Sequence, residues 1–232
     1  MHLSAGTSGY NYDAWKGAFY PEKLAKSKML SYYATQLSTV EINYTFYRMP
    51  NEKTMAGWAA QVGERFRFAL KASQRITHQK RLSGCDDELA YFLKVSEALG
   101  EKRGPILFQL PPNMKIDLSR LGQFLRLLPR GVQSAFEFRH QSWLDETTFS
   151  TLREAGAALC IADTDDLSTP PVRTADYGYL RLRREDYDAA TIKKWRRRID
   201  ELGISGDVYV YFKHEDGALG PKLARQLLDA RG

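Results

Sequence analysis

The chain has 232 residues, of which 43% are hydrophobic and 12% aromatic, so it is long and apolar enough to bury a sizeable core. The net charge of +6, from 34 basic and 28 acidic residues, favours anionic partners in general but is too mild to indicate nucleic acid by itself. No apolar run approaches the roughly 18 residues that a membrane span needs, and the N-terminus has no leader pattern, so a cytoplasmic protein with no membrane partner is expected.

Eight short segments with the pattern of β-strands recur along the chain, separated by amphipathic helical patterns. The predicted strands are Leu3–Ser8, Thr39–Tyr44, Phe66–Ala72, Ile106–Leu110, Ala135–Arg139, Ala158–Asp163, Tyr177–Arg183 and Val208–Lys213. The predicted helices span residues 24–37, 52–62, 86–99, 118–128, 145–155, 188–202 and 218–230. Residues 165–176, between strands six and seven, contain Pro170-Pro171 and no amphipathic period, so we expect that helix to be missing or reduced to a turn.

This alternation predicts an α/β fold, a closed parallel (β/α)8 barrel of the TIM type, whose usual length is about 250 residues. No Gly/Ser-rich or Pro-rich linker divides the sequence, so residues 1–232 are predicted to form a single domain. The competing fold is a doubly wound open sheet, whose central strands are apolar on both faces. Here one face is apolar while the other turns polar toward the C-terminal end of each strand, which favours the barrel.

Polar residues at the C-terminal ends of the predicted strands form the candidate site, because the loops of a barrel converge there. They are Ser8, Glu41, Asn43, Lys71, Gln109, Glu137, Arg139, Asp163, Arg181, Arg183, Tyr211 and Lys213. Any one of them could be a solvated rim residue or part of a structural ion pair. Together they would be costly to bury without pairing or a ligand, so we expect a functional pocket in this ring.

The charges of this ring favour an anionic ligand, because five cations outnumber three carboxylates and arginine forks suit phosphate or carboxylate oxygens. Glu41 and Glu137 stand three strands apart and could divide acid and base roles, as in glycoside hydrolysis. The alternative, which we favour, is that each neutralises a neighbouring Arg or Lys. His140, in the loop after strand five, is a further acid/base candidate.

No metal or cofactor is predicted. His78, His140 and His214 fall in loops at the predicted mouth, but no metal-binding spacing, nucleotide-binding loop or nucleophile motif occurs. Cys85 and Cys160 are far apart without metal-site spacing, and Cys160 is predicted to be a small core residue.

Aromatic residues gather in the loops that follow the strands, and they either stack on a sugar or base or form an apolar lid. They are Tyr10, Tyr12, Trp15, Phe46, Tyr47 and Trp143. We favour the lid and keep Tyr10 and Trp143 as candidate ligand contacts.

Ordered motifs over nearly the whole chain resemble the YecE-like family, a domain of unknown function numbered seventy-two. They are Gly6-Thr7-Ser8-Gly9-Tyr10, Phe19-Tyr20-Pro21, Val40-Glu41-Ile42-Asn43, Thr45-Phe46-Tyr47, Lys71, Thr77-His78, Gln109-Leu110-Pro111-Pro112, Glu137-Phe138-Arg139-His140, Ser142-Trp143 and Val208-Tyr209-Val210-Tyr211-Phe212. The resemblance implies a TIM-type barrel without a settled activity, and a likeness to endonuclease IV-type barrels implies nucleic-acid binding.

Two departures from the family pattern fall at the candidate site. After strand seven the family usually reads Arg-x-His-Gly, whereas this chain has Arg181-Leu182-Arg183-Arg184. After strand eight it usually reads Asn-Asn, whereas this chain has Lys213-His214. If the usual residues carry the chemistry of the family, altered specificity or lost activity is expected here.

Three functions stay open. The first, which we favour, is a pocket for a small phosphorylated or carboxylate ligand, in a hydrolase or isomerase. The second is a nucleic-acid-binding phosphodiesterase, although the basic run Lys193–Arg198 has the pattern of a solvated helix face. The third is a ligand sensor without enzymatic activity. The sequence does not predict the oligomeric state.

Overall fold

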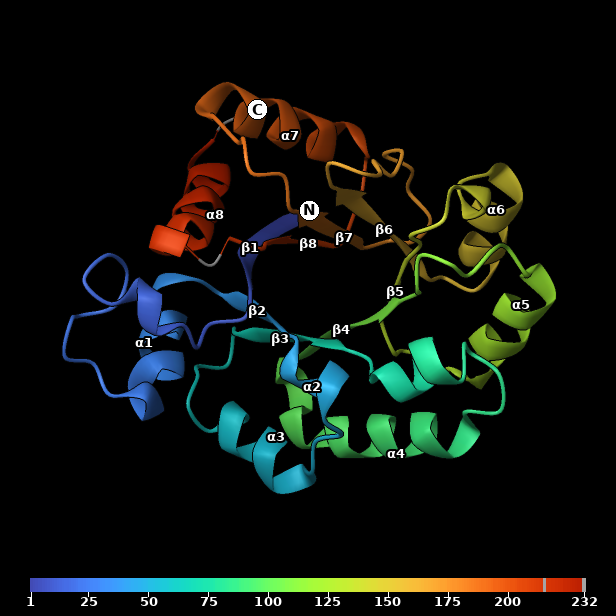
Figure 1. Cartoon of the computed structure of the whole chain (residues 1–232), viewed down its shortest axis with the longest axis horizontal. Coiled ribbons are helices and arrows are strands. Elements are labelled where there is room, and N and C mark those ends of the chain that lie inside the picture. Colours follow the sequence, from blue (N-terminus) through green and yellow to red (C-terminus); the bar gives the residue numbers. More distant parts are fainter. Residues whose placement is uncertain (215, 231–232) are drawn as a thin grey trace.

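Eight parallel strands close into a barrel in which each strand pairs with the next along the chain and β8 pairs with β1. The computed structural model describes residues 1–214 and 216–230. The strands are β1 (His2–Ser8), β2 (Thr39–Ile42), β3 (Arg67–Lys71), β4 (Arg103–Gln109), β5 (Ser134–Glu137), β6 (Ala158–Asp163), β7 (Gly178–Leu182) and β8 (Asp207–Phe212). Figure 1 shows these strands at the centre of the molecule. The predicted (β/α)8 barrel is confirmed.

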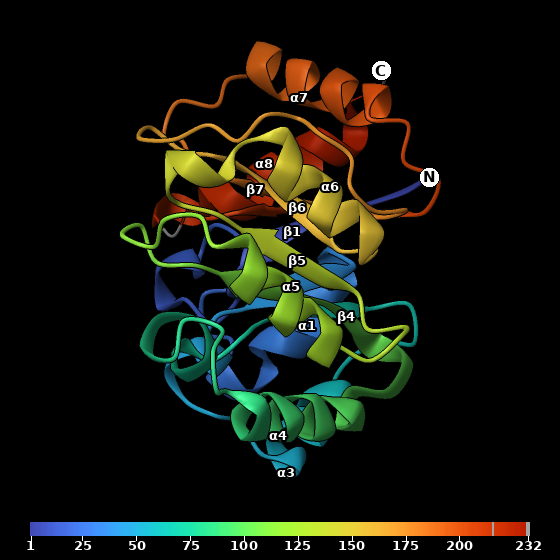
Figure 2. The same cartoon turned by 90° about the vertical axis from the view of Figure 1, so that its right-hand side faces the viewer.

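Helices surround the barrel, so that α3 and α7 lie on opposite sides with the strands between them (Figure 2). The helices are α1 (Met29–Gln36), α2 (Tyr44–Tyr47), α3 (Glu52–Ala59), α4 (Asp86–Ser96), α5 (Leu118–Leu127), α6 (Glu146–Glu154), α7 (Ala189–Glu201) and α8 (Leu219–Asp229). Short helical turns are η1 (Asp13–Trp15), η2 (Lys26–Lys28), η3 (Arg75–Gln79), η4 (Glu97–Lys102), η5 (Gln141–Trp143) and η6 (Asp216–Ala218). Within the described ranges, no helix is both long enough and apolar enough to cross a membrane.

Local side-chain chemistry explains where several helices begin. The helices α3, α5, α6 and α7 each follow an Asn or Asp whose side chain accepts the backbone N–H three residues later, which caps the helix. The predicted strand Thr39–Tyr44 is two residues shorter in the structure, and Thr45 lies in the helix that follows it. Its Oγ1 donates to the carbonyls of Ile42 (3.1 Å) and Lys71 (2.6 Å), so β2 ends at Ile42 and the chain turns at once into α2.

The segment between β6 and β7, residues 164–177, contains no helix, as predicted. It is held against β6 by single polar contacts instead. The Thr174 hydroxyl accepts the Leu159 N–H at 2.7 Å and donates to the Ala157 carbonyl at 2.7 Å. The Thr169 N–H donates to the Ala162 carbonyl at 2.9 Å. This side of the barrel is therefore covered by a loop, which also borders the mouth.

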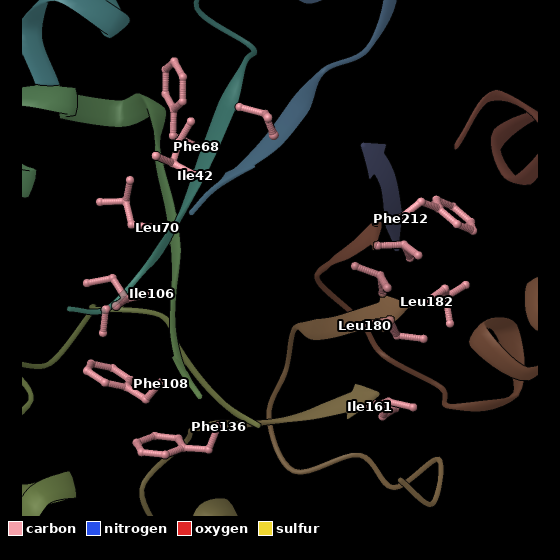
Figure 3. Close-up of a cluster of buried hydrophobic side chains, with 14 of the residues drawn as sticks. Ile42, Phe68, Leu70, Ile106, Phe108, Phe136, Ile161, Leu180, Leu182 and Phe212 are labelled. Carbon is pink, nitrogen blue, oxygen red and sulfur yellow. The ribbon is translucent and has the colours of Figure 1, made fainter. Parts of the chain in front are cut away.

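Strand alternation divides the buried residues into two layers. Residues under the helices form one apolar cluster, which includes Phe108, Phe136 and Leu180. Figure 3 shows these side chains on the outer side of the strands, pointing away from the barrel interior. Small residues and the rings of Tyr179 and Tyr211 fill the interior as a second cluster. Because all strands are parallel, the polar residues above this inner layer meet at one mouth.

Candidate functional site

The floor of the mouth is a buried ion-pair network centred on Arg181 of β7. Its Nη1 donates to Oε2 of Glu137 on β5 at 2.5 Å, and its Nη2 donates to Oε1 of Glu41 on β2 at 2.7 Å. All three residues are at most 1% exposed. These strands lie on different sides of the barrel, so one guanidinium links them across the interior.

The remaining carboxylate oxygens of this network also have donors. The Tyr179 hydroxyl donates to Oε2 of Glu41 at 2.7 Å, and Nε2 of Gln109 donates to Oε1 of Glu137 at 2.8 Å. Burial by itself lowers the pKa of Arg181, but the two carboxylates more than offset this effect and hold its pKa above the ordinary value. Arg181 is therefore a permanent cation whose two Nη groups are occupied by protein.

A cavity of about 780 Å³ opens above this floor, among the ends of β5 to β8 and the loops that follow them. Its basic lining comes from Arg139, Arg183 and Lys213, and Glu137 reaches it from the floor. Nη2 of Arg183 lies 3.5 Å from Oε2 of Glu137, so Arg183 links the cavity to the buried network. Its buried Nε has no hydrogen-bond partner among the described residues.

The prediction of a cation excess holds for the strand ends and is wrong for the cavity as a whole. Asp165, Asp166, Glu185 and Asp216 also line the cavity, so that the described lining holds five carboxylates and three permanent cations. These four acidic residues are exposed and follow the strands, three of them on loops and Asp216 at the start of η6, whereas Arg183 is half-buried. The cavity therefore has a basic side at the strand ends and an acidic rim.

Lys71, the last residue of β3, lies beside the network and is 8% exposed. Its Nζ sits 3.8 Å from the centroid of the Phe46 ring. Burial is the main reason that the pKa of Lys71 falls to about 8, and the neighbouring Arg181 lowers it further. A lysine with this pKa is partly uncharged near neutral pH.

The predicted site residues separate into four groups. Glu137, Arg139, Arg183 and Lys213 line the cavity. Ser8, Glu41, Lys71, Gln109 and Arg181 are buried and do not line it. Tyr10 and Asn43 line a second, smaller cavity beside β1 and β2. The others, Asp163, Trp143, Tyr211 and His140, line neither.

Asp163 was wrongly placed on the inner face. It shares the outer face of β6 with Leu159 and Ile161, which pack under the helices, while Cys160 faces inward as the predicted core residue. The Asp163 carboxylate accepts a hydrogen bond from the Tyr187 hydroxyl at 2.8 Å. Its role in this structure is to hold the loop after β7.

Trp143, Tyr211 and His140 are engaged by protein groups. The Trp143 ring stacks on Phe138 with centroids 4.7 Å apart, and its Nε1 donates to the Met114 carbonyl at 2.8 Å. The Tyr211 hydroxyl pairs with the Thr39 hydroxyl at 2.7 Å. Nδ1 of His140 accepts the Ser142 N–H at 3.1 Å at the start of η5. Trp143 and Tyr211 are fully buried and line neither cavity, and all three residues stay predictions as site residues, with one ring nitrogen of His140 committed to a cap.

The predicted aromatic lid is confirmed in part. Trp15, Phe46 and Trp143 are buried and pack under the loops, whereas Tyr47 is 71% exposed. Among the residues that the structure describes, no three His, Cys, Asp or Glu side chains are grouped so that they could hold a metal ion.

Comparison with known proteins gives the family. A sequence profile described as a protein of unknown function, DUF72, matches residues 4–232. The chain belongs to the DUF72 family. This confirms the resemblance found in the sequence motifs.

Individual DUF72 relatives agree with this assignment. The UPF0759 protein YecE of Escherichia coli strain K12 is 30% identical over 141 residues, which are 58% of this chain and 52% of that protein. The chain thus spans about half the length of the curated relatives it matches. A DUF72 family protein from Thermotoga maritima MSB8 has 26% identity and a TM-score of 0.84, with 99% of this chain and 100% of that chain covered. D-psicose 3-epimerase from Clostridium cellulolyticum H10, at 12% identity and a TM-score of 0.52 over 98% and 96% of the two chains, is similar in fold alone.

The two departures from the expected DUF72 motifs have a structural location. Arg183 stands where the motif resemblance leads one to expect histidine, and Lys213 where it leads one to expect asparagine. Both side chains line the cavity. Two of the three basic residues that line the cavity therefore stand where this sequence departs from the expected motifs.

Sequence reasoning missed the acidic rim and the partner of Glu41. Asp165, Asp166 and Glu185 follow β6 and β7 within a few residues, and extending the search past the strand ends would have found them. Tyr179 carried no such signal, because its ring belongs to the inner apolar cluster and only its hydroxyl reaches the carboxylate.

Proposed function

We propose that this DUF72 barrel binds a small phosphorylated or carboxylate compound in the mouth cavity. The observation that carries the proposal is the basic side of the cavity, where Arg139, Arg183 and Lys213 converge from three strand ends. The guanidinium of Arg183 lines the cavity and can donate to an anionic oxygen. A volume of about 780 Å³ suits a metabolite of moderate size.

The acidic rim narrows the ligand class. Carboxylates cannot hold a second anion, but they accept hydrogen bonds from hydroxyl or amino groups. A ligand with an anionic end and hydroxyl groups, such as a sugar phosphate or a hydroxy acid, matches both sides. Its anionic group would lie against Arg183, and its hydroxyls near Asp165 and Asp166.

Of the two reaction types, isomerase chemistry fits better than hydrolysis by two carboxylates. Hydrolysis needs a protonated acid on one side of the bond and a base on the other. Glu41 is fully buried, ion-paired and outside the cavity lining, so it cannot reach a bound ligand. Glu137 borders the cavity, so it is the carboxylate of this pair that is placed to exchange a proton with a ligand.

Calorimetric titration with inorganic phosphate, followed by a panel of sugar phosphates and hydroxy acids, tests the proposal. Arg183→Gln removes a charged donor and should weaken phosphate binding about tenfold or more. Arg153→Gln is the matched control, because that side chain pairs with the exposed Glu146 and does not line the cavity. Equal binding by both variants, or no binding by the unmodified chain, would overturn the proposal.

A further inference from the structure

A second cavity, of about 410 Å³, lies between the loop after β1 and the helices α2 and α3. Its lining shares no residue with that of the mouth cavity. Four aromatic side chains surround it, namely Tyr10, Tyr12, Tyr44 and Trp58. Among the described residues, no Asp, Glu, Lys, Arg or His lines this second cavity. A charged ligand would lose its hydration here without gaining an opposite charge, so the lining favours an uncharged ligand.

Two of these rings are fixed by contacts with the rest of the protein. The Tyr12 hydroxyl donates to the Ser8 carbonyl at 2.8 Å, and Trp58 stacks on Phe68 of β3 with ring centroids 6.4 Å apart. A Cβ atom at Gly9 would lie 2.4 Å from the Tyr12 hydroxyl oxygen, so glycine allows this ring to sit over the loop. The rings are therefore in place before a ligand arrives, which lowers the entropic cost of binding.

Tyr44, the first residue of α2, is the exposed ring of the set at 46% exposure. Its ring meets that of Trp58 at 88°, with centroids 6.2 Å apart, so the two form a corner rather than a slot. A nucleobase is flat and stacks between side chains that face each other. A corner suits a saturated ring, which has thickness and presents C–H groups to the negative face of an aromatic ring.

Two amide side chains supply polar contacts at the same cavity. Asn43 directly precedes α2 but makes no capping hydrogen bond with it, and Asn11 is exposed in the loop after β1. A side-chain amide offers two donors and an acceptor oxygen, whereas each hydroxyl of a sugar is both a donor and an acceptor. The cavity thus provides aromatic rings for the C–H face of a sugar and amides for its hydroxyls.

We propose that this second cavity binds an uncharged monosaccharide. The C–H face of the sugar ring lies against Tyr44, and its hydroxyls hydrogen-bond to the amide of Asn43. A volume of about 410 Å³ falls in the lower part of the range of small-molecule sites, roughly 300–1,000 Å³, which suits a ligand of one ring. This inference goes beyond the proposed function and does not depend on it, because none of the residues that line the mouth cavity takes part.

Titration of the chain with D-glucose, D-galactose and D-mannose, followed by two-dimensional ¹H–¹⁵N NMR, tests this site. The chain has four tryptophans, so the indole N–H signals can be assigned by replacing each tryptophan with phenylalanine. We expect at least one sugar to shift the Trp58 signal with a Kd on the order of millimolar. The signals of Trp143 and Trp195, which do not line this cavity, should stay unchanged.

Variants at the lining identify the contacts. Tyr44→Ala removes the exposed ring and should weaken sugar binding about fivefold or more, whereas Tyr44→Phe keeps the ring and should retain the affinity. Asn43→Ala removes the amide and should weaken binding about threefold to tenfold. Tyr91→Ala is the matched control, because Tyr91 is also 46% exposed but does not line the cavity, and its affinity should equal that of the unmodified chain.

The other possible ligands are outcomes of the same titration. A Trp58 shift with uracil and with none of the sugars would overturn the sugar assignment, and an equal response to cyclohexanol would overturn the role of the amides. No Trp58 shift with any sugar up to about 50 mM, well above the expected Kd, would overturn the site itself. These spectra of the unmodified chain decide the question even if a variant fails to fold. Phosphate binding is measured separately and should be unchanged in Tyr44→Ala, so that the failure of this site and the failure of the proposed function are distinguishable.

Discussion

Removing the central cation of the buried network is the most direct test of the site geometry. The substitution Arg181→Met keeps an unbranched apolar stem but removes the guanidinium and with it both ion pairs, at 2.5 Å to Glu137 and 2.7 Å to Glu41. Both carboxylates are at most 1% exposed, so water cannot replace the guanidinium without opening the barrel. The buried Glu41 carboxylate would then lose its ion-pair partner, and Glu137 would keep only the longer pair with Arg183, 3.5 Å away.

The structure gives the size of the expected effect. Each hydrogen bond to a charged group contributes about 1.5–3 kcal/mol, and breaking a buried ion pair from one side costs about 3–5 kcal/mol. We therefore expect Arg181→Met to lower the free energy of unfolding by about 3–6 kcal/mol. Adding Glu41→Gln and Glu137→Gln removes the uncompensated charge and should recover roughly half of the loss.

Urea unfolding followed by tryptophan fluorescence and circular dichroism measures these differences. Arg184→Met is the matched control, because its ion pair with Asp186 is exposed and should contribute less than about 1 kcal/mol. A loss below about 1 kcal/mol for Arg181→Met would show that the carboxylates are not buried as described. A triple variant less stable than Arg181→Met would show that uncompensated charge is not the cause.

Three further predictions follow from the contacts described above. Trp143→Phe removes the hydrogen bond to the Met114 carbonyl and should lower the free energy of unfolding by about 1–3 kcal/mol without changing phosphate affinity; altered affinity would place the ring in the site. Burial raises the pKa of Cys85 to about 11 and that of Cys160 well above its ordinary value, so neither should react with a disulfide reagent at pH 8 before unfolding, and rapid labelling of either would contradict its burial. The pKa of Lys71 is lowered on folding, so the unfolded chain binds more protons between about pH 8 and pH 10.5, and stability relative to Lys71→Met should rise with pH across that range. A flat difference between the two unfolding curves would show that Lys71 is not desolvated.

The sequence predicted the fold well because a parallel barrel repeats one pattern eight times. Period-two alternation placed Glu41, Glu137 and Arg181 on inward faces, and parallel connections then required their ends to meet at one mouth. The ends of the strands were predicted less accurately where a side-chain hydrogen bond turns the chain out of the strand. The Thr45 hydroxyl bonds to two carbonyls from different strands, a tertiary contact that no local pattern reveals.

The chemistry of the site could be predicted only in part, because burial and pairing depend on geometry. Residue type alone made Glu41 a candidate acid, and only its contacts with Arg181 and Tyr179 show that it is a structural partner. Asp163 was assigned to the inner face because it ends a predicted strand, although the alternation of side chains along β6 puts it on the outer face. Counting from Cys160, which faces inward, would have placed it correctly.

The stability of the ion-pair network and the lowered pKa of Lys71 have a common cause. Two carboxylates and two cations are buried at the strand ends, and the planar fork of Arg181 pairs with both carboxylates at once, whereas a lysine ammonium is a single compact charge. The Lys71 ammonium therefore contacts the Phe46 ring. In Arg181→Met the carboxylates would become available to Lys71, and the repulsion from Arg181, which now lowers its pKa, would vanish. The amine should then hold its proton to higher pH, and the rise of stability with pH that depends on Lys71 should become smaller in that variant. The residue that stabilises the floor of the mouth is, on this reasoning, also one that lowers the pKa of the neighbouring amine, second to burial.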